Sequence, residues 1–311
     1  MEDVFEVANK IKRLEIQGAR NIAIAAIKAI ESAAIKTKAK NKDEILKELY
    51  EARDVLFKSR VTEPLMRNAV RRIIAQLEET HEDNVGVLRE VISLTANQFL
   101  EDFDRSGRLI AEIGSKRIRD GMVVFTHCHS STVTNILKKA REEGKTFEVI
   151  CTETRPLFQG RITAKELVEA GIKTTLIVDS AARFFMNEVD MVIVGADAIT
   201  SEGNIVNKIG TSAIALIAKE ARTPFYVASE LLKFDPETMY GDYEKIEERS
   251  PREVWDNPPE PLIIRNPAFD VTRRDFIHGI ICEEGIISPH TIVEVVRRRY
   301  PWIFSSNLPR F

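Results

Sequence analysis

A chain of 311 residues is longer than one compact core of ordinary size requires, so two domains are expected. Its 45 basic and 48 acidic residues nearly balance, which excludes a protein that binds nucleic acid through bulk positive charge. No apolar run approaches the roughly 20 residues of a membrane-spanning helix, and the first residues lack the pattern of a signal peptide. We therefore expect a cytoplasmic protein whose partners include neither nucleic acid nor a membrane.

The first part of the chain has a helical pattern. Apolar residues recur three and four positions apart, as in Val4, Val7 and Ile11, without the alternation of a strand. This periodicity predicts a helical domain over residues 1–119 with roughly five helices, the last of which, about 84–117, is unusually long. The expected breaks between the helices are Gly18, the segment 41–43, Pro64 and Asn84.

At Gly121 the pattern changes to short runs rich in Val, Ile and Phe that alternate with amphipathic segments. This predicts an α/β domain over residues 120–311, with a doubly wound, mainly parallel, Rossmann-like sheet buried on both faces. The expected strands are 122–126, 146–151, 174–178, 190–194, 225–228 and 262–265, and the expected helices are 132–143, 163–169, 181–186 and 211–221. A long surface connection is expected over residues 235–261.

Sites in such a sheet lie beyond the carboxyl ends of the strands. The first strand leads into Cys128 and then into three hydroxyl residues at a helix N-terminus, where free backbone N–H groups favour an anion. These hydroxyl residues are Ser130, Ser131 and Thr132. The alternative interpretation is that they only cap the helix and that Cys128 is a small buried apolar side chain.

The cysteines and histidines do not indicate a metal site. The three cysteines lie far apart without a Cys-x-x-Cys spacing, so neither a disulfide framework nor a zinc ribbon is expected. On a continued strand, His127 and His129 would face away from the thiol of Cys128, and metal ligands must converge. Gly-rich nucleotide loops and the H-E-x-x-H motif are also absent from the sequence. We expect neither a metal nor a cofactor.

Asp197 directly follows the apolar run 191–196. Burial at that place should raise the pKa of its carboxyl, so that it can hold a proton at neutral pH. Alternatively, Asp197 only caps the following turn. A thiol and a buried carboxyl suit proton transfer on a small molecule.

Local cations accompany these two groups. Asn207 and Lys208 open a further helix, and Lys233 follows the strand end at 228–230, which itself carries Glu230. A lysine at such a place is commonly just solvated, but it can also hold a phosphate. Together these parts suit a phosphorylated small-molecule substrate.

Several motifs resemble a known family, the group that unites the regulatory subunits of translation initiation factor 2B with two sugar-phosphate isomerases. The resemblance covers nearly the whole chain. Within the family, the motif at 126–130, a short length and two further stretches are most similar to archaeal ribose 1,5-bisphosphate isomerases, which form ribulose 1,5-bisphosphate during AMP and nucleoside monophosphate degradation. The motifs are T-H-C-H-S-S (126–131), T-E-T-R-P (152–156), V-G-A-D (194–197), N-K-I-G-T (207–211), N-P-A-F-D-V-T (266–272), V-D-S-A-A-R (178–183) and K-F-D-P-E-T (233–238).

The resemblance implies roles for particular residues. It makes Cys128 the proton acceptor and Asp197 the proton donor, and we expect the adjacent helix N-terminus to favour a Cys128 thiolate. The implied substrate contacts are Gly18, Ala19, Arg20, Arg60, Ser130, Ser131, Thr132, Asn207, Lys208 and Lys233. The chain departs from the family pattern at Gln17, where a cation is lost, and at Val61, where a proline is lost.

The resemblance also implies partners and leaves alternatives open. It implies a phosphorylated pentose as substrate, a homo-oligomer built as a hexamer from three dimers, and AMP as a candidate activator. One alternative is a regulatory subunit without catalysis, which Cys128 disfavours because those subunits lack a cysteine there. The other is a methylthioribose-1-phosphate isomerase, which shares both catalytic residues but usually has N-x-G in place of residues 129–131.

Overall fold

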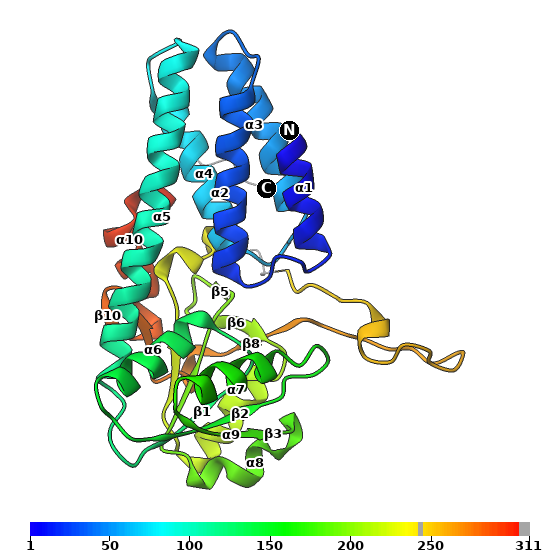
Figure 1. The fold of residues 1–311 in the computed structure, drawn as a ribbon, viewed down its shortest axis with the longest axis vertical. Helices are drawn as coiled ribbons and strands as arrows, with labels where there is room; N and C mark the ends of the chain where they lie inside the picture. Colours follow the sequence, from blue (N-terminus) through cyan, green and yellow to red (C-terminus); the bar gives the residue numbers. More distant parts are fainter. Residues whose placement is uncertain (242–244, 305–311) are drawn as a thin grey trace.

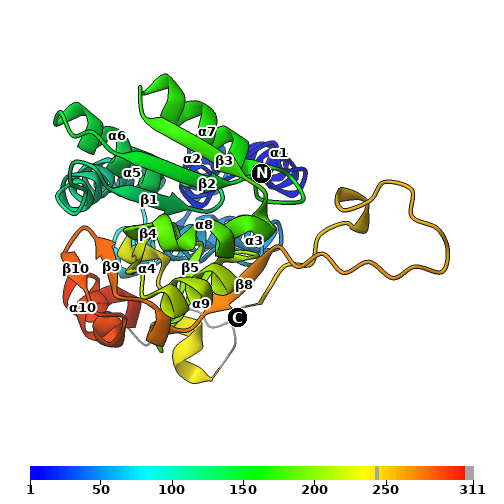
Figure 2. The same cartoon turned by 90° about the horizontal axis from the view of Figure 1, so that it is seen from below.

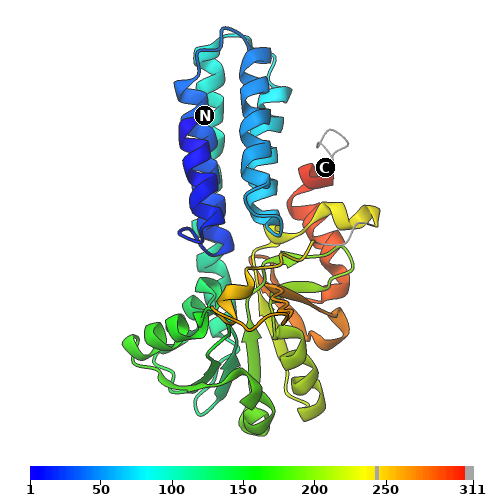
Figure 3. The ribbon, with the colours of Figure 1, turned by 90° about the vertical axis from the view of Figure 1, so that its right-hand side faces the viewer.

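The computed structural model describes residues 1–241 and 245–304. Its first part is a bundle of long helices, α1 to α5, which stands above a mixed α/β region (Figures 1 and 3). The helices are α1 (Glu2–Lys12), α2 (Ala19–Lys36), α3 (Lys42–Phe57), α4 (Pro64–Glu79) and α5 (Val85–Ser115). The sequence therefore predicted the helical region and its long last helix correctly.

The breaks between these helices have simple local causes. Asn41 begins α3 by accepting a hydrogen bond from the N–H of Glu44, and Asn84 begins α5 in the same way. Pro64 occupies the first turn of α4, where a missing N–H costs nothing. Gly18 precedes α2 with a φ of 83°, which suits glycine far better than other residues.

The α/β region is built on a sheet of seven strands in the order β10-β9-β7-β4-β1-β2-β3. All neighbours are parallel except β10, which pairs antiparallel with β9. The strands are β1 (Val123–Thr126), β2 (Glu148–Thr152), β3 (Lys173–Ile177), β4 (Met191–Val194), β7 (Phe225–Ala228), β9 (Gly279–Cys282) and β10 (Gly285–Ile287). The predicted α/β fold with a mainly parallel sheet is confirmed.

Helices cover this sheet and a smaller sheet lies beside it (Figure 2). The helices are α6 (Ser131–Glu142), α7 (Gln159–Glu169), the short α8 (Ala182–Phe185), α9 (Thr211–Ala221) and α10 (Ile292–Arg299). The smaller sheet is antiparallel and consists of β5 (Ala198–Ile199), β6 (Ile205–Lys208) and β8 (Phe269–Thr272). Sequence reasoning missed this sheet, β9 and β10.

The predicted strand at 262–265 is wrong. These residues belong to an arm that projects sideways from the α/β region (Figures 1 and 2), and Ile263 on it is 84% exposed. Pro261 and Pro267 flank the run, and a proline cannot donate a hydrogen bond to a neighbouring strand. The apolar residues of this run therefore pair with no strand, and β9 is the strand that pairs with β7. The predicted surface connection at 235–261 includes the start of this arm and, at 242–244, lies outside the described residues.

The helical bundle and the α/β region share apolar packing. One continuous buried cluster runs from Val4 in α1 through Phe125 in β1 to Ile303 near the end of the described chain. The division into domains 1–119 and 120–311 stays a prediction. Within the described ranges, no helix is both long and apolar enough to cross a membrane.

Candidate active site

A pocket of about 420 Å³ lies where the helical bundle meets the carboxyl ends of the strands. The pocket is lined by residues from the start of α2, from the loop before α4, from the ends of β1 and β4, and from the arm. Every residue that the resemblance implied lines it, namely Gly18, Ala19, Arg20, Arg60, Cys128, Ser130, Ser131, Thr132, Asp197, Asn207, Lys208 and Lys233.

Cys128 sits between β1 and α6 in an unusual backbone conformation. Its φ of 68° lies in the left-handed region, which costs free energy for a residue other than glycine. Two threonines hold it there, since its N–H donates to Thr154 Oγ1 (2.9 Å) and its carbonyl accepts from Thr163 Oγ1 (2.9 Å). Ser130 then caps α6 by accepting from the N–H of Val133. The capping interpretation of Ser130 therefore holds alongside its place in the pocket.

The expectation that the helix N-terminus favours a Cys128 thiolate is wrong. Burial raises the pKa of the thiol to about 11, and the Lys208 ammonium and a backbone hydrogen bond at His129 only partly oppose this effect. The helix N-terminus is a partial charge, whereas loss of solvent disfavours a full thiolate charge. At neutral pH the side chain is therefore chiefly a thiol.

The two histidines beside Cys128 have structural partners. His127 is buried and lies 2.6 Å from Thr152 Oγ1 through Nδ1 and 2.9 Å from the carbonyl of Ile209 through Nε2. His129 lies 3.2 Å from Thr163 Oγ1. Burial lowers the pKa of both imidazoles. Among the residues that the structure describes, no cluster of His, Cys, Asp or Glu is arranged to hold a metal ion.

Asp197 follows β4 and faces the same pocket as Cys128. Burial raises the pKa of its carboxyl, as the sequence predicted, while Lys233, Arg60 and Lys208 lower it in part. Gly195 allows this approach, because a Cβ there would lie 2.7 Å from Ser130 Oγ. The ends of β1 and β4, which are neighbours in the sheet, thus bring a thiol and a carboxyl to one cavity.

The cations around the pocket are already paired within the chain. Lys233 is only 5% exposed, so the expectation of a solvated lysine is wrong for it; its Nζ donates to the Ala196 carbonyl at 2.8 Å. Arg60 Nε lies 3.4 Å from a Glu247 carboxylate oxygen. Arg20 Nη2 lies 2.5 Å from Asp104 Oδ1. A phosphate that enters the pocket must compete with these carboxylates.

Asn207 and Lys208 stand on β6 of the small sheet. Asn207 Nδ2 donates to Thr211 Oγ1 at 3.0 Å, which ties the strand to the start of α9. Lys208 Nζ lies 5.0 Å from the centre of the Phe269 ring, close enough for a cation–π contact. The sequence placed these two residues at a strand-to-helix junction, but the strand belongs to a second sheet.

Sequence reasoning missed two groups of residues near the pocket. Arg249, Glu253, Asn266 and Phe269 reach the pocket from the arm and its end, and the motif at 266–272 was the available signal. Glu63, at the start of α4, is fully buried, and neither of its carboxyl oxygens has a hydrogen-bond partner among the described residues. No sequence signal marked Glu63, because its neighbours come from distant parts of the chain.

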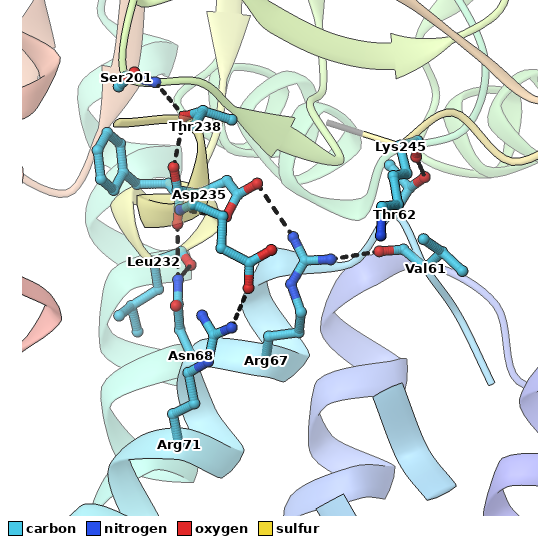
Figure 4. Close-up of polar contacts among 12 residues, drawn as sticks. Val61, Thr62, Arg67, Asn68, Arg71, Ser201, Leu232, Asp235, Thr238 and Lys245 are labelled. Carbon is cyan, nitrogen blue, oxygen red and sulfur yellow. Dashed lines mark hydrogen bonds and ion pairs between the residues drawn. The ribbon is translucent and has the colours of Figure 1, made fainter. Parts of the chain in front are cut away.

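The two departures from the family pattern have local roles in the structure. Gln17 Nε2 donates to the Leu14 carbonyl at 2.7 Å, which closes the turn before α2. The Val61 carbonyl accepts a hydrogen bond from Arg67 (Figure 4). Both positions therefore shape the loops that carry Arg20 and Arg60 rather than supplying charge themselves.

Comparison with known proteins supports the resemblance. Ribose 1,5-bisphosphate isomerase of Archaeoglobus fulgidus is 46% identical over 304 residues, which cover 96% of this chain and 94% of that protein. The protein of the same name from Pyrococcus furiosus is 42% identical over 319 residues, or 99% and 98% of the two chains. A crystal structure described as translation initiation factor eIF-2B of Pyrococcus horikoshii OT3 matches with a TM-score of 0.81 at 34% identity and covers 93% of this chain and 98% of that one.

These relatives decide the class of protein. Because the curated relatives are named as sugar-phosphate isomerases, the prediction of an enzyme of that class is confirmed. A profile of the Initiation factor 2 subunit family matches residues 15–289. The chain therefore belongs to the Initiation factor 2 subunit family.

Proposed function

We propose that this protein converts ribose 1,5-bisphosphate to ribulose 1,5-bisphosphate, with Cys128 and Asp197 as its acid–base pair. The observation that carries the proposal is a thiol and a carboxyl in one cavity, in a chain with curated relatives named ribose 1,5-bisphosphate isomerase over nearly its full length. The reaction would belong to AMP and nucleoside monophosphate degradation.

The chemistry requires two groups that handle protons. Carbon 1 of the substrate carries a phosphate, so the sugar ring must open before hydrogen can move between carbons 2 and 1. In the proposal, the bond between carbon 1 and the ring oxygen breaks as neutral Asp197 donates a proton to that oxygen and the Cys128 thiolate accepts the proton of carbon 2. The thiol then returns this proton to carbon 1 while the Asp197 carboxylate recovers one from the carbon 2 hydroxyl, which becomes the carbonyl of the ketose. The raised pKa of Asp197 supports the donor role. The Lys208 ammonium, which opposes the effect of burial on the Cys128 pKa, supports formation of the minor thiolate species.

Two phosphates need cations on both sides of the sugar. The pocket has Arg20 and Arg60 on the side of the helical bundle and Lys208 and Lys233 on the side of the strands. Arginine suits phosphate because its guanidinium can donate two parallel hydrogen bonds. The N-terminus of α6, from Ser131, offers backbone N–H groups as a further anion site.

The decisive assay compares two substrates on the same purified protein. We expect ketose formation from ribose 1,5-bisphosphate with a kcat/KM at least about a hundredfold above that for methylthioribose 1-phosphate, since the latter leaves one set of cations without a phosphate. The reverse preference would make the protein a methylthioribose-1-phosphate isomerase. No turnover of either sugar by folded protein would favour the regulatory-subunit alternative.

Assembly and regulation are further parts of the proposal. A hexamer of three dimers predicts a mass near six times 35.3 kDa in analytical ultracentrifugation. Activation by AMP predicts a higher initial rate when AMP is added at fixed ribose 1,5-bisphosphate. A monomer, or a rate that AMP leaves unchanged, would remove the corresponding part and leave the isomerase assignment in place.

A further inference from the structure

The end of β7 carries a buried carboxyl that the proposed reaction does not use. Glu230 is 2% exposed, and its Oε2 lies 3.3 Å from the Nζ of Lys233. Burying a carboxylate costs free energy unless a positive charge or hydrogen bonds compensate it. The pairing with Lys233 supplies that compensation inside the protein.

The partner of Glu230 is itself fixed against the site. Lys233 Nζ donates to the carbonyl of Ala196, the residue directly before Asp197. The turn that carries Lys233 is attached to α4, because Asn68 Nδ2 donates to the carbonyls of Leu232 and Phe234 at 2.8 Å each (Figure 4). The ammonium therefore has little freedom to leave the neighbourhood of Asp197.

Three carboxyl groups interact with the single ammonium group of Lys233. The carboxyls that interact with Lys233 are Glu230, Asp197 and Glu63. Glu230 also interacts with Arg20, and Asp197 with Arg60, Lys208, Glu247 and Cys128. Burial alone would raise the pKa of Glu230, but Lys233 with its neighbours holds it below its ordinary value. Burial raises the pKa of Asp197 and of Glu63. The Lys233 ammonium thus pairs with Glu230 and is also the largest of the charges that lower the pKa of Asp197.

We propose that Glu230 is a positioning residue that keeps Asp197 protonated, because it holds Lys233 at the Ala196 carbonyl and neutralises an ammonium that would otherwise stabilise the Asp197 carboxylate. The residue acts through Lys233 and touches no substrate. The proposal rests on the donor role given to Asp197 in the proposed function.

The test is a pH titration of the Asp197 carboxyl without substrate. Protein labelled with ¹³C at the aspartate carboxyl is followed by NMR, and the Asp197 signal is assigned with Asp197→Asn. In Glu230→Gln the freed ammonium should lower the midpoint by about one pH unit. Above the midpoint, a shift of one pH unit lowers the protonated fraction of Asp197 about tenfold, so kcat/KM for ribose 1,5-bisphosphate should fall about tenfold. Glu230→Asp should restore most of the midpoint and most of kcat/KM.

Glu283→Gln is the matched control. Glu283 is also buried and near Glu230, but its partners are the hydroxyl of Tyr300 (3.0 Å) and the N–H of Leu231 rather than Lys233. It should leave the Asp197 midpoint unchanged. An unmoved or raised midpoint in Glu230→Gln, or an equal shift in Glu283→Gln, would overturn the proposal.

A folding failure of the variant and a failure of the proposed function can both be distinguished from a failure of the Glu230 proposal. If Glu230→Gln fails to fold by circular dichroism, Glu230→Asp decides, because its shorter side chain weakens the pairing and should lower the midpoint by a smaller amount; an unmoved midpoint then overturns the proposal. A wild-type protein that titrates as expected but does not isomerise ribose 1,5-bisphosphate would count against the proposed function alone.

Discussion

The two sides of the pocket hold their charged groups in different ways. On the side of the strands, hydrogen bonds to the backbone hold two groups: Thr154 and Thr163 bind the N–H and the carbonyl of Cys128, and Lys233, which also pairs with the buried Glu230, donates to the Ala196 carbonyl. Rigid placement of this kind is what proton transfer requires.

On the side of the helical bundle, the cations are paired with carboxylates of the same chain. Arg20 contacts Asp104 on α5, which is largely exposed, and Arg60 contacts Glu247 near the arm. A phosphate can replace the exposed Asp104 carboxylate at little cost, since surface ion pairs contribute little stability, whereas the Arg60–Glu247 pair is largely buried. In the proposed function, proton transfer therefore belongs to the strand side and the bundle side contributes to substrate binding.

The largest expected effect is on the strand side. Cys128→Ser and Asp197→Asn should each lower kcat by about a thousandfold or more, because each removes one of the two proton-handling groups. The measurement is ketose formation at saturating substrate, with circular dichroism as the check on folding. A rate within tenfold of wild type in either variant would remove that residue from the acid–base pair.

The reactivity of the thiol gives a second test of the strand side. With a pKa raised to about 11 by burial, Cys128 should be alkylated by iodoacetamide roughly a hundredfold faster at pH 9 than at pH 7, since the thiolate fraction grows with pH. Cys151 and Cys282 are fully buried and should stay unmodified in the same sample. Mass spectrometry of the modified peptides measures all three, and a rate at Cys128 that levels off below pH 8 would contradict the raised pKa.

On the bundle side we expect an effect on binding. Arg20→Ala should raise KM about tenfold and change kcat by less than about twofold, because it removes a phosphate contact rather than a reacting group. Asp104→Ala is the paired control: it frees Arg20 from its carboxylate and should leave KM equal or lower. A fall in kcat with an unchanged KM in Arg20→Ala would reverse the division between the two sides.

The smallest expected effect is on the pH dependence of folding stability, and it comes from Glu63 at the start of α4. Burial raises the pKa of Glu63 from 4.5 to about 8, so the folded protein binds this proton more tightly than the unfolded chain. Its contribution to stability is complete below pH 4.5 and is lost as pH rises through about 8.

Glu63→Gln should therefore flatten the pH dependence of Tm. Between pH 5 and pH 9, wild type should lose on the order of 4 kcal/mol more stability than Glu63→Gln, which corresponds to several degrees in Tm. Calorimetry at the two pH values measures the difference. Parallel pH profiles for the two proteins would show that the Glu63 carboxyl is ionised in the folded state.

The sequence was sufficient where local patterns determine structure. Caps such as Asn84 and the continuous apolar run at 191–194 predicted the long helix and the central strands, because both features act within a few residues. The run at 262–265 failed for the converse reason: apolar residues predict burial only where a neighbouring strand is present. The short strands of the small sheet carry too few residues for a pattern.

In the candidate site, too, features set by local sequence could be predicted, whereas features set by distant contacts could not. That Cys128 and Asp197 line one cavity could be predicted, because the carboxyl ends of neighbouring parallel strands meet at one edge of the sheet. Glu63 could not be predicted, since its surroundings depend on how α4 packs against distant segments. The pKa of Cys128 was predicted in the wrong direction because the extent of its burial depends on the surrounding fold rather than on the adjacent helix.

The central claim is that Cys128 and Asp197 act together on a doubly phosphorylated pentose. The most direct measurement is a ³¹P NMR time course of ribose 1,5-bisphosphate with wild type, Cys128→Ser and Asp197→Asn in parallel. We expect the signals of ribulose 1,5-bisphosphate to grow with wild type and to stay at background with both folded variants. An unchanged substrate with wild type, or conversion by both variants at the wild-type rate, would contradict the claim.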